Sequence, residues 1–195
     1  MCKIKRTPLE NADKFILGNV LWGYDKYNAE VYAQLAYDDT GFLVKFTVCE
    51  ADPLRTKTKH FEYVHEDSCV EFFVNFMPEK RSHYISFEPN AHGALTVAFR
   101  TDRHNSVPLK IEEIEGFHIT PEIHEDYWTI TYMVGFDFIQ NYYPEFDIKD
   151  CKYIIGNLYK CGDETETVHY KSYYPVGTEK PDYHRPEYFG KFEVE

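Results

Sequence analysis

Residues 31–48 read VYAQLAYDDTGFLVKFTV, and this stretch decides the fold class. Apolar side chains recur at every second position on both sides of the polar DDTG sequence at 38–41. A period of two is typical of a half-buried strand, and aspartate, threonine and glycine favour a turn between two strands. The stretch therefore predicts a β-hairpin with one strongly apolar face.

The same alternation continues along most of the chain. It predicts further strands over 68–76, 84–90, 93–99, 117–123, 128–134, 152–161, 167–173 and 188–194. Residues 136–143 predict a short helix that Pro144 ends, and residues 51–64, 101–108 and 175–186 predict loops. With about ten strands and at most one or two short helices, we expect an all-β fold, an antiparallel β-sandwich or flattened barrel. We interpret residues 1–195 as one domain.

The charge balance narrows the choice of partners. The 195-residue chain has 21 basic and 33 acidic residues, which gives a net charge of −12. An acidic protein repels phosphate backbones and anionic lipid, so we expect neither nucleic acid nor a membrane surface as partner. The start of the chain shows no apolar signal segment, which predicts a cytoplasmic location. Nothing in the sequence predicts the oligomeric state.

Aromatic residues make up 17% of the chain, with 17 Tyr, 15 Phe and 2 Trp. Such usage favours strands and surfaces that bind ligands by stacking. Trp128 alternates with apolar neighbours and is predicted to lie in the core. Trp22 lies in an early coil, where it either closes the edge of the sandwich or lines a site.

Cysteine and histidine spacing does not define a metal site. The cysteines at 2, 49, 69, 151 and 161 form no C-x-x-C pair, and we interpret Cys49 and Cys69 as small buried hydrophobic residues. The nine histidines lack the helical spacing of a zinc protease. No cofactor is therefore predicted with certainty. A structural calcium ion held by loop carboxylates such as Asp38, Asp39 or Asp163 is kept as an alternative.

Two glutamates lie within strands that are otherwise mainly apolar, and their positions indicate a candidate binding face. Glu71 and Glu88 both project from the face of their strands opposite the apolar one. If these strands are neighbours, the two carboxylates share a face with Phe73, Asn75, Tyr84 and Ser86. Carboxylates bind sugar hydroxyls and aromatic rings stack on the C–H faces of sugars, so this face suits a polyhydroxylated ligand. The alternative is a second core layer with a few charges at its edge.

Three segments carry a resemblance to a known family. They are residues 67–74 (DSCVEFFV), residues 156–163 (GNLYKCGD) and residues 184–192 (HRPEYFGKF). In this order they resemble family 9 carbohydrate-binding modules, and the middle one is similar to the form in the bacterial family 9-like branch. The resemblance covers residues 29–194 and implies a distorted antiparallel β-sandwich of immunoglobulin-like or jelly-roll-like architecture. It also implies binding of sugar-chain ends between two aromatic rings, and often a structural calcium ion.

The resemblance also implies candidate ligand-binding residues. The family's strand glutamate matches Glu71, and its first clamp tryptophan matches His65, with Tyr63 close by. The second clamp tryptophan matches Tyr183. The family's arginine falls near Glu88 and its glutamine near Tyr159, so Arg185 or Arg81 is expected to supply the missing positive charge. The candidate set is Tyr63, His65, Glu71, Glu88, Tyr159, Tyr183 and Arg185, with no catalytic residue.

Three functions follow from these observations. The first is binding of a mono- or oligosaccharide end without catalysis, in the setting of bacterial carbohydrate catabolism and in association with glycoside hydrolases. The second is a glycoside hydrolase, or a subunit of one, that uses Glu71 and Glu88. The third is a structural or protein-interaction sandwich whose sugar site has decayed. Occlusion of Tyr63 and Tyr183 would favour the third.

Overall fold

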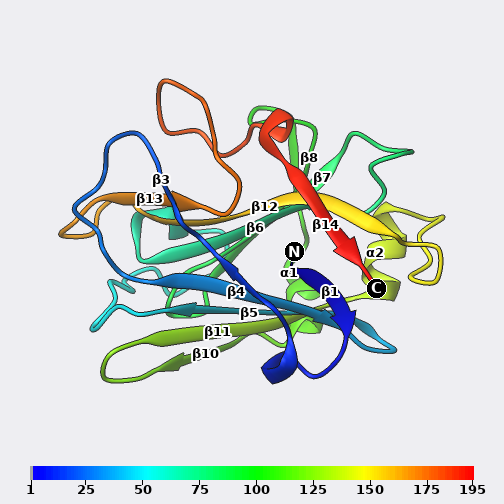
Figure 1. Cartoon of the computed structure of the whole chain (residues 1–195), viewed down its shortest axis with the longest axis horizontal. Helices are drawn as coiled ribbons and strands as arrows, with labels where there is room; N and C mark the ends of the chain where they lie inside the picture. Colours follow the sequence, from blue (N-terminus) through cyan, green and yellow to red (C-terminus); the bar gives the residue numbers. More distant parts are fainter. Residues whose placement is uncertain (1) are drawn as a thin grey trace.

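The computed structural model describes residues 2–195, and most of its regular structure is β (Figure 1). The strands are β1 (Lys3–Arg6), β2 (Lys14–Ile16), β3 (Asn19–Val20), β4 (Val31–Tyr37), β5 (Gly41–Val48), β6 (Cys69–Asn75), β7 (Tyr84–Pro89), β8 (Leu95–Arg100), β9 (Ser106–Pro108), β10 (Thr120–Ile123), β11 (Trp128–Gly135), β12 (Tyr153–Gly162), β13 (His169–Ser172) and β14 (Gly190–Val194). The helices are α1 (Ile111–Ile114), α2 (Phe136–Tyr142) and single 3-10 turns at Leu9–Asn11, Val64–Glu66, Glu115–Phe117 and Pro186–Tyr188.

The predicted hairpin is confirmed as β4 and β5, which pair antiparallel with Leu35 opposite Val44. Asp38 shapes the turn, because its carboxylate accepts hydrogen bonds from the backbone N–H groups of Thr40 and Gly41. Position 41 requires glycine, since a Cβ there would lie 2.5 Å from the carbonyl oxygen of Val134 in β11. The hairpin thus lies tightly against β11, and β10 and β2 complete this half of the sheet.

The second half of the sheet contains the strands around Glu71 and Glu88. Its order is β14-β12-β6-β7-β8-β9, with β13 beside β12 and β3 beside β13. All of these pairs are antiparallel. Figure 1 shows β12 and β6 running side by side above β4 and β5.

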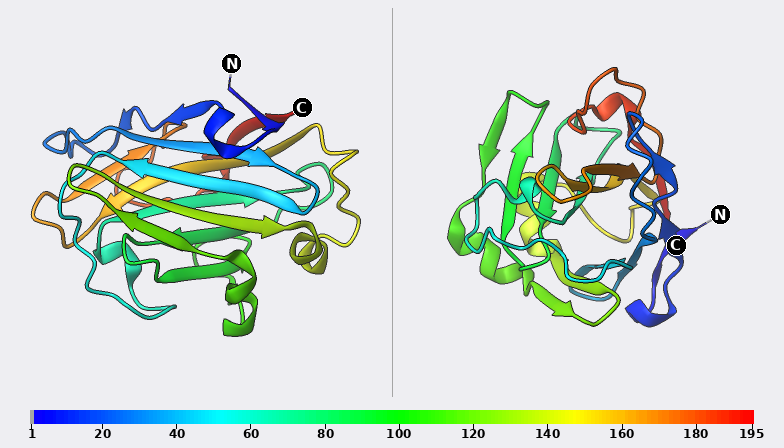
Figure 2. Two further views of the ribbon diagram at one scale, coloured as in Figure 1. Left: turned by 90° about the horizontal axis from the view of Figure 1, so that it is seen from below. Right: turned by 90° about the vertical axis from the view of Figure 1, so that its left-hand side faces the viewer.

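The purely antiparallel arrangement expected from the sequence is wrong at one strand. β1 pairs parallel with β14 through Lys3 and Ile4, and parallel with β4 through Lys5 and Arg6. Its few residues therefore join the two halves into one mixed sheet, which curls around the core (Figure 2). This pairing satisfies backbone groups that would otherwise be open at the edges of β4 and β14. A four-residue strand is too short to show the alternation by which the longer strands were found.

The hydrophobic core lies between the two halves. It takes alternate side chains from each side, such as Val44 and Phe46 of β5 and Val70 and Phe72 of β6. Trp128 is fully buried in this core, as predicted. The helix predicted over 136–143 is confirmed as α2.

Some local expectations differ from the structure. Cys49 is exposed rather than buried, because it follows the last paired residue of β5. Residues 106–108, predicted as loop, pair with β8 as β9, and the strand predicted to begin at 117 begins at 120. Phe117 ends a 3-10 turn instead and packs into the core. Within residues 2–195, no helix has the length and apolar character needed to cross a membrane.

Candidate functional site

A pocket of about 330 Å³ opens on the face of β6 and β7 that points away from the main core. Phe72 pairs with Phe87, and Cys69 bridges to Asn90, so the register places Glu71 across from Glu88. The two strands are therefore neighbours and carry both carboxylates on one face. The residues that line the pocket are Trp22, Phe61, Glu62, Tyr63, His65, Glu71, Glu88, Thr96, Arg100, Arg103, Cys161, Asp163, Tyr170, Pro181, Asp182, Tyr183 and His184.

A second hydrophobic cluster covers the rest of this face. It consists of Leu21, Val64, Cys69, Phe73, Tyr84, Ala94, Tyr159, Cys161, Tyr170, Val176 and Tyr183. The second core layer expected as the alternative is therefore present, and the pocket opens beside it. Burial in this layer leaves Glu71 only 4% and Glu88 only 6% exposed.

Glu88 is the most unusual group in the pocket. Its Oε1 atom is buried and has no hydrogen-bond partner in the part of the chain that the structure describes. Arg100 of β8 lies nearby, with a guanidinium nitrogen 3.6 Å from that atom, and Nε of Arg100 donates to Ser86. Burial raises the pKa of Glu88, and the positive charge of Arg100 opposes this effect. A buried acceptor without a partner in a native structure requires an explanation, and a ligand donor supplies one.

Glu71 has a different environment. The thiol of Cys161 donates a hydrogen bond to its Oε1 atom over 3.2 Å. Burial raises the pKa of Glu71 well above its ordinary value, and the neighbouring Cys161 and Glu88 add to the rise. The floor of the pocket therefore presents one carboxyl group that favours protonation and a second that has an arginine beside it.

Aromatic side chains surround these carboxylates. Tyr63 is 70% exposed and meets His65 edge to face, with the ring centres 5.8 Å apart. Trp22 lies in a left-handed turn (φ 54°), and its indole N–H donates to the carbonyl oxygen of Thr178 over 2.8 Å. This bond holds the indole ring against Tyr170 and Tyr183. Aromatic faces beside polar groups are typical of sites that bind ring-shaped polar ligands.

Comparisons with known proteins identify the family. The sequence model described as "Carbohydrate-binding family 9" matches residues 7–194. The chain belongs to carbohydrate-binding family 9. No curated protein sequence matches it.

Solved structures share the fold of this family 9 chain. A Bacteroides uniformis protein to which carbohydrate binding is ascribed is 24% identical, with a TM-score of 0.85 over 100% of this chain and 98% of that one. A family 9 module from Caldicellulosiruptor kristjanssonii, solved with glucose, is 10% identical, with a TM-score of 0.70 over 100% and 95%. A structure described as a family 9 module of the same organism with cellotriose is 9% identical, with a TM-score of 0.70 over 100% and 93%. At these identities the likeness shows a shared fold.

Five of the seven candidate residues of this family 9 protein line the pocket: Tyr63, His65, Glu71, Glu88 and Tyr183. Tyr159 lies beneath it, fully buried, and stacks on Tyr183 with the ring centres 4.0 Å apart. Arg185 is outside the lining and pairs with Glu187, and Arg81 pairs with Glu145. Asp38 caps its turn and Asp39 pairs with Arg6, so both loop carboxylates have partners within the protein.

Tyr183 is less accessible than the sequence suggested. Its proline-rich coil could present the ring to a ligand, as the family resemblance suggested, or pack it onto the sandwich as a plug, and Tyr183 is only 8% exposed. Its hydroxyl group donates to the carbonyl oxygen of Lys160 over 2.9 Å, and its ring lies between Tyr159 and Trp22. The reason is that the coil folds back onto the second core layer. Tyr183 is thus mainly a packing residue that also lines the pocket.

The positive charge of the pocket comes from residues that the sequence analysis missed. Arg100 and Arg103 line it, and Arg103 pairs with Asp182 over 2.9 Å. The period of two places Arg100 on the same strand face as Thr96, but the sequence does not show which residues this face meets. That face meets Glu88 because β8 pairs with β7, with Thr96 opposite Glu88. Trp22 was recognised as a candidate, but only the tertiary structure shows that it lines the pocket.

Proposed function

We propose that this protein binds a monosaccharide or the end of an oligosaccharide in the pocket above Glu71 and Glu88, without catalysis. The observation that carries the proposal is the buried, unpartnered oxygen of Glu88 beside Arg100, in a pocket with the exposed ring of Tyr63. Membership of family 9 and the shared fold of a family 9 module solved with glucose support it. Bacterial carbohydrate catabolism in the cytoplasm, alongside glycoside hydrolases, is the setting we propose.

Each group has a role in this proposal. A sugar hydroxyl donates to the free oxygen of Glu88 and accepts from Arg100, which satisfies both groups with one ligand. The C–H face of the sugar stacks on Tyr63. A hydrogen bond to a charged group contributes about 1.5–3 kcal/mol, so these contacts account for selective binding of a small ligand.

The test is calorimetric titration of the protein with glucose, cellotriose and other mono- and oligosaccharides. Tyr63→Ala removes the exposed ring, and Tyr127→Ala is the matched control because Tyr127 is also exposed but lies outside the pocket. We expect binding that Tyr63→Ala weakens and Tyr127→Ala leaves unchanged. Absence of binding across a glycan array, or equal affinity in both variants, would refute the proposal.

The two carboxylates also favour a second candidate, glycoside hydrolysis. Glu71 and Glu88 face the same pocket from adjacent strands, and burial raises the pKa of both. A carboxyl group with a raised pKa is suited to act as a general acid beside a second carboxylate. Release of reducing sugar that is lost in both Glu71→Gln and Glu88→Gln would establish this candidate. Binding without turnover would exclude it for the sugars tested.

The structure gives the third function, a decayed site, limited support. Tyr183 is occluded, as that interpretation requires, but Tyr63 is 70% exposed beside the pocket. Neither this exposed ring nor the buried Oε1 atom of Glu88, which lacks a hydrogen-bond partner among the described residues, has an evident structural purpose. We therefore rank the decayed site below sugar binding.

A further inference from the structure

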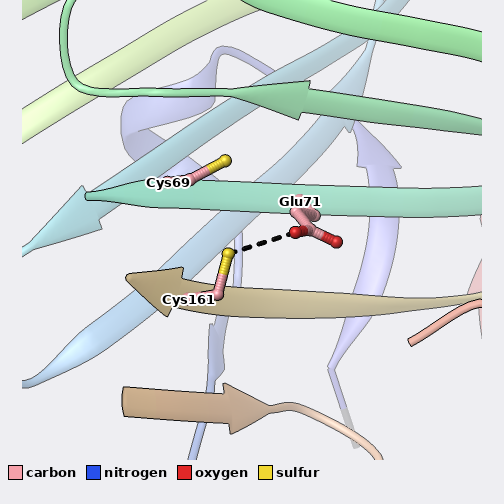
Figure 3. Close-up of side chains that lie close together, drawn as sticks. All are labelled: Cys69, Glu71 and Cys161. Atoms are coloured by element: carbon pink, nitrogen blue, oxygen red, sulfur yellow. Dashed lines mark hydrogen bonds between the residues drawn. The ribbon is translucent and has the colours of Figure 1, made fainter. Parts of the chain in front are cut away.

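Two cysteines and a glutamate converge at the floor of the pocket. Cys69 and Glu71 project from the same face of β6, and Cys161 projects from β12 directly opposite Cys69 (Figure 3). The two sulfur atoms and a carboxylate oxygen of Glu71 all lie within 4.8 Å of one another. All three side chains are at least nine-tenths buried. Figure 3 shows the Cys161 sulfur facing the Glu71 carboxylate between the strands. The thiol lies 3.2 Å from Oε1 of Glu71.

This geometry fits the ligand spacing of a tetrahedral soft metal ion. Zn–S bonds of about 2.3 Å and Zn–O bonds of about 2.0–2.2 Å place neighbouring ligand atoms roughly 3.5–4 Å apart. The Cys161 sulfur lies 3.2 Å from Glu71, and all three ligand atoms lie within 4.8 Å of one another, so one ion can contact all three once the side chains adjust. The strands fix the three positions, because cross-strand neighbours on one face hold their Cβ atoms about 4.5–5.5 Å apart.

We propose that Cys69, Cys161 and Glu71 bind a thiophilic divalent cation, with zinc as the best fit. Two thiolates and one carboxylate are three protein ligands, and water from the pocket occupies the fourth position. The ion reaches the site through the pocket, because Glu71 and Cys161 line it. Besides Glu71, four acidic residues line the pocket (Glu62, Glu88, Asp163 and Asp182) against two basic ones (Arg100 and Arg103), so the lining charge still favours a cation.

The site has a consequence for ligand binding, and this part rests on the proposed sugar function. Glu71 cannot at once bind a metal ion and offer the same oxygen to a sugar. We therefore expect zinc to lower the affinity for any sugar that contacts Glu71. Metal binding itself is measured without sugar, so failure of one proposal is distinguishable from failure of the other.

The experiment uses Co²⁺ as a probe of thiolate ligation in the full-length, reduced protein. We expect a thiolate-to-cobalt charge-transfer absorption in the near ultraviolet that stoichiometric Zn²⁺ abolishes. Cys161→Ser and Cys69→Ser should each remove the band and weaken Zn²⁺ binding at least about 100-fold, more than the loss of an outer-shell group. Cys49→Ser is the matched control, because Cys49 is exposed and lies outside the cluster.

A second variant and a second measurement keep the proposal open to refutation if a serine variant fails to fold. Cys161→Ala removes the sulfur without adding a polar group, and its metal-free melting curve establishes folding. A cobalt spectrum without a thiolate band, or a band that survives in folded Cys161→Ala, overturns the proposal. Three titratable thiols instead of five in the denatured, unreduced protein also overturn it, because Cys69 and Cys161 would then be a disulfide.

Discussion

Replacement of Tyr183 by alanine separates packing from ligand binding at the pocket. Tyr183 is 8% exposed, stacks on Tyr159 with the ring planes 15° apart, and donates its hydroxyl group to Lys160. Truncation of a buried aromatic side chain costs about 3–5 kcal/mol. In a protein of this size 1 kcal/mol shifts the melting temperature by about 2–4 °C. We therefore expect Tyr183→Ala to melt roughly 6–20 °C below the wild type.

Tyr183→Phe divides this loss into its parts. It retains the ring and removes only the hydrogen bond to the Lys160 carbonyl group, so we expect a loss of about 0.5–1.5 kcal/mol. Both variants are measured by thermal and urea denaturation, followed by far-ultraviolet circular dichroism. The urea midpoint gives the change in the free energy of unfolding provided that the slope stays constant.

The result that refutes this reasoning is a melting temperature of Tyr183→Ala within about 2 °C of the wild type, which corresponds to 1 kcal/mol or less. Tyr183 would then be a presented ring, as its proline-rich coil suggested. Selective loss of sugar binding in a fully stable variant would lead to the same conclusion. A large loss of stability would assign Tyr183 to the second core layer.

Three other variants test separate parts of the structure. Tyr63→Ala should lower sugar affinity about tenfold in calorimetry, a change of about 1.4 kcal/mol. In urea denaturation it should alter the free energy of unfolding by less than about 0.5 kcal/mol. Glu71→Gln should flatten the loss of stability as the pH rises above 4.5. Folding raises the pKa of Glu71, so this group stabilises the fold below its ordinary pKa of 4.5 and the contribution is lost as the pH rises. An unchanged pH profile would contradict this. His169→Gln should flatten the loss of stability below pH 6.5. Burial lowers the pKa of His169 to about 3, so this group stabilises the fold above pH 6.5 and the contribution is lost as the pH falls from 6.5 towards 3. Equal acid midpoints for variant and wild type would count against this.

The long strands could be predicted because each carries enough residues to show a period of two. β4 matches its predicted bounds, and the hairpin turn follows from Asp38 and Gly41. The parallel strand β1 could not be found this way. Its four residues are held by pairing with β4 and with β14, and β14 lies at the other end of the chain. Its place depends on tertiary contacts, which local sequence does not contain.

Some features of the candidate site also follow from local sequence, and others depend on tertiary contacts. Glu71 and Glu88 could be predicted to share a face, because a charge at an alternating position must point away from the core. Arg100 could not be placed beside Glu88 until the β7–β8 pairing was known. The sequence left open whether Tyr183 is buried or presented, because the path of a coil is set by what it packs against. In this case Tyr159 and Trp22 receive the ring.

The two faces of β6 show why such a site can exist in a stable protein. Val70 and Phe72 on one face belong to the main core, while Glu71 on the other lies in the second layer beside the pocket. A carboxylate buried without a full set of partners destabilises the fold by several kcal/mol unless it is protonated or paired. Burial of the neighbouring residues Val70 and Phe72 in the main core offsets this penalty. The strand can therefore hold Glu71 in a fixed position of low exposure, where a hydrogen bond or a metal bond gains more than at the surface because less water competes for it.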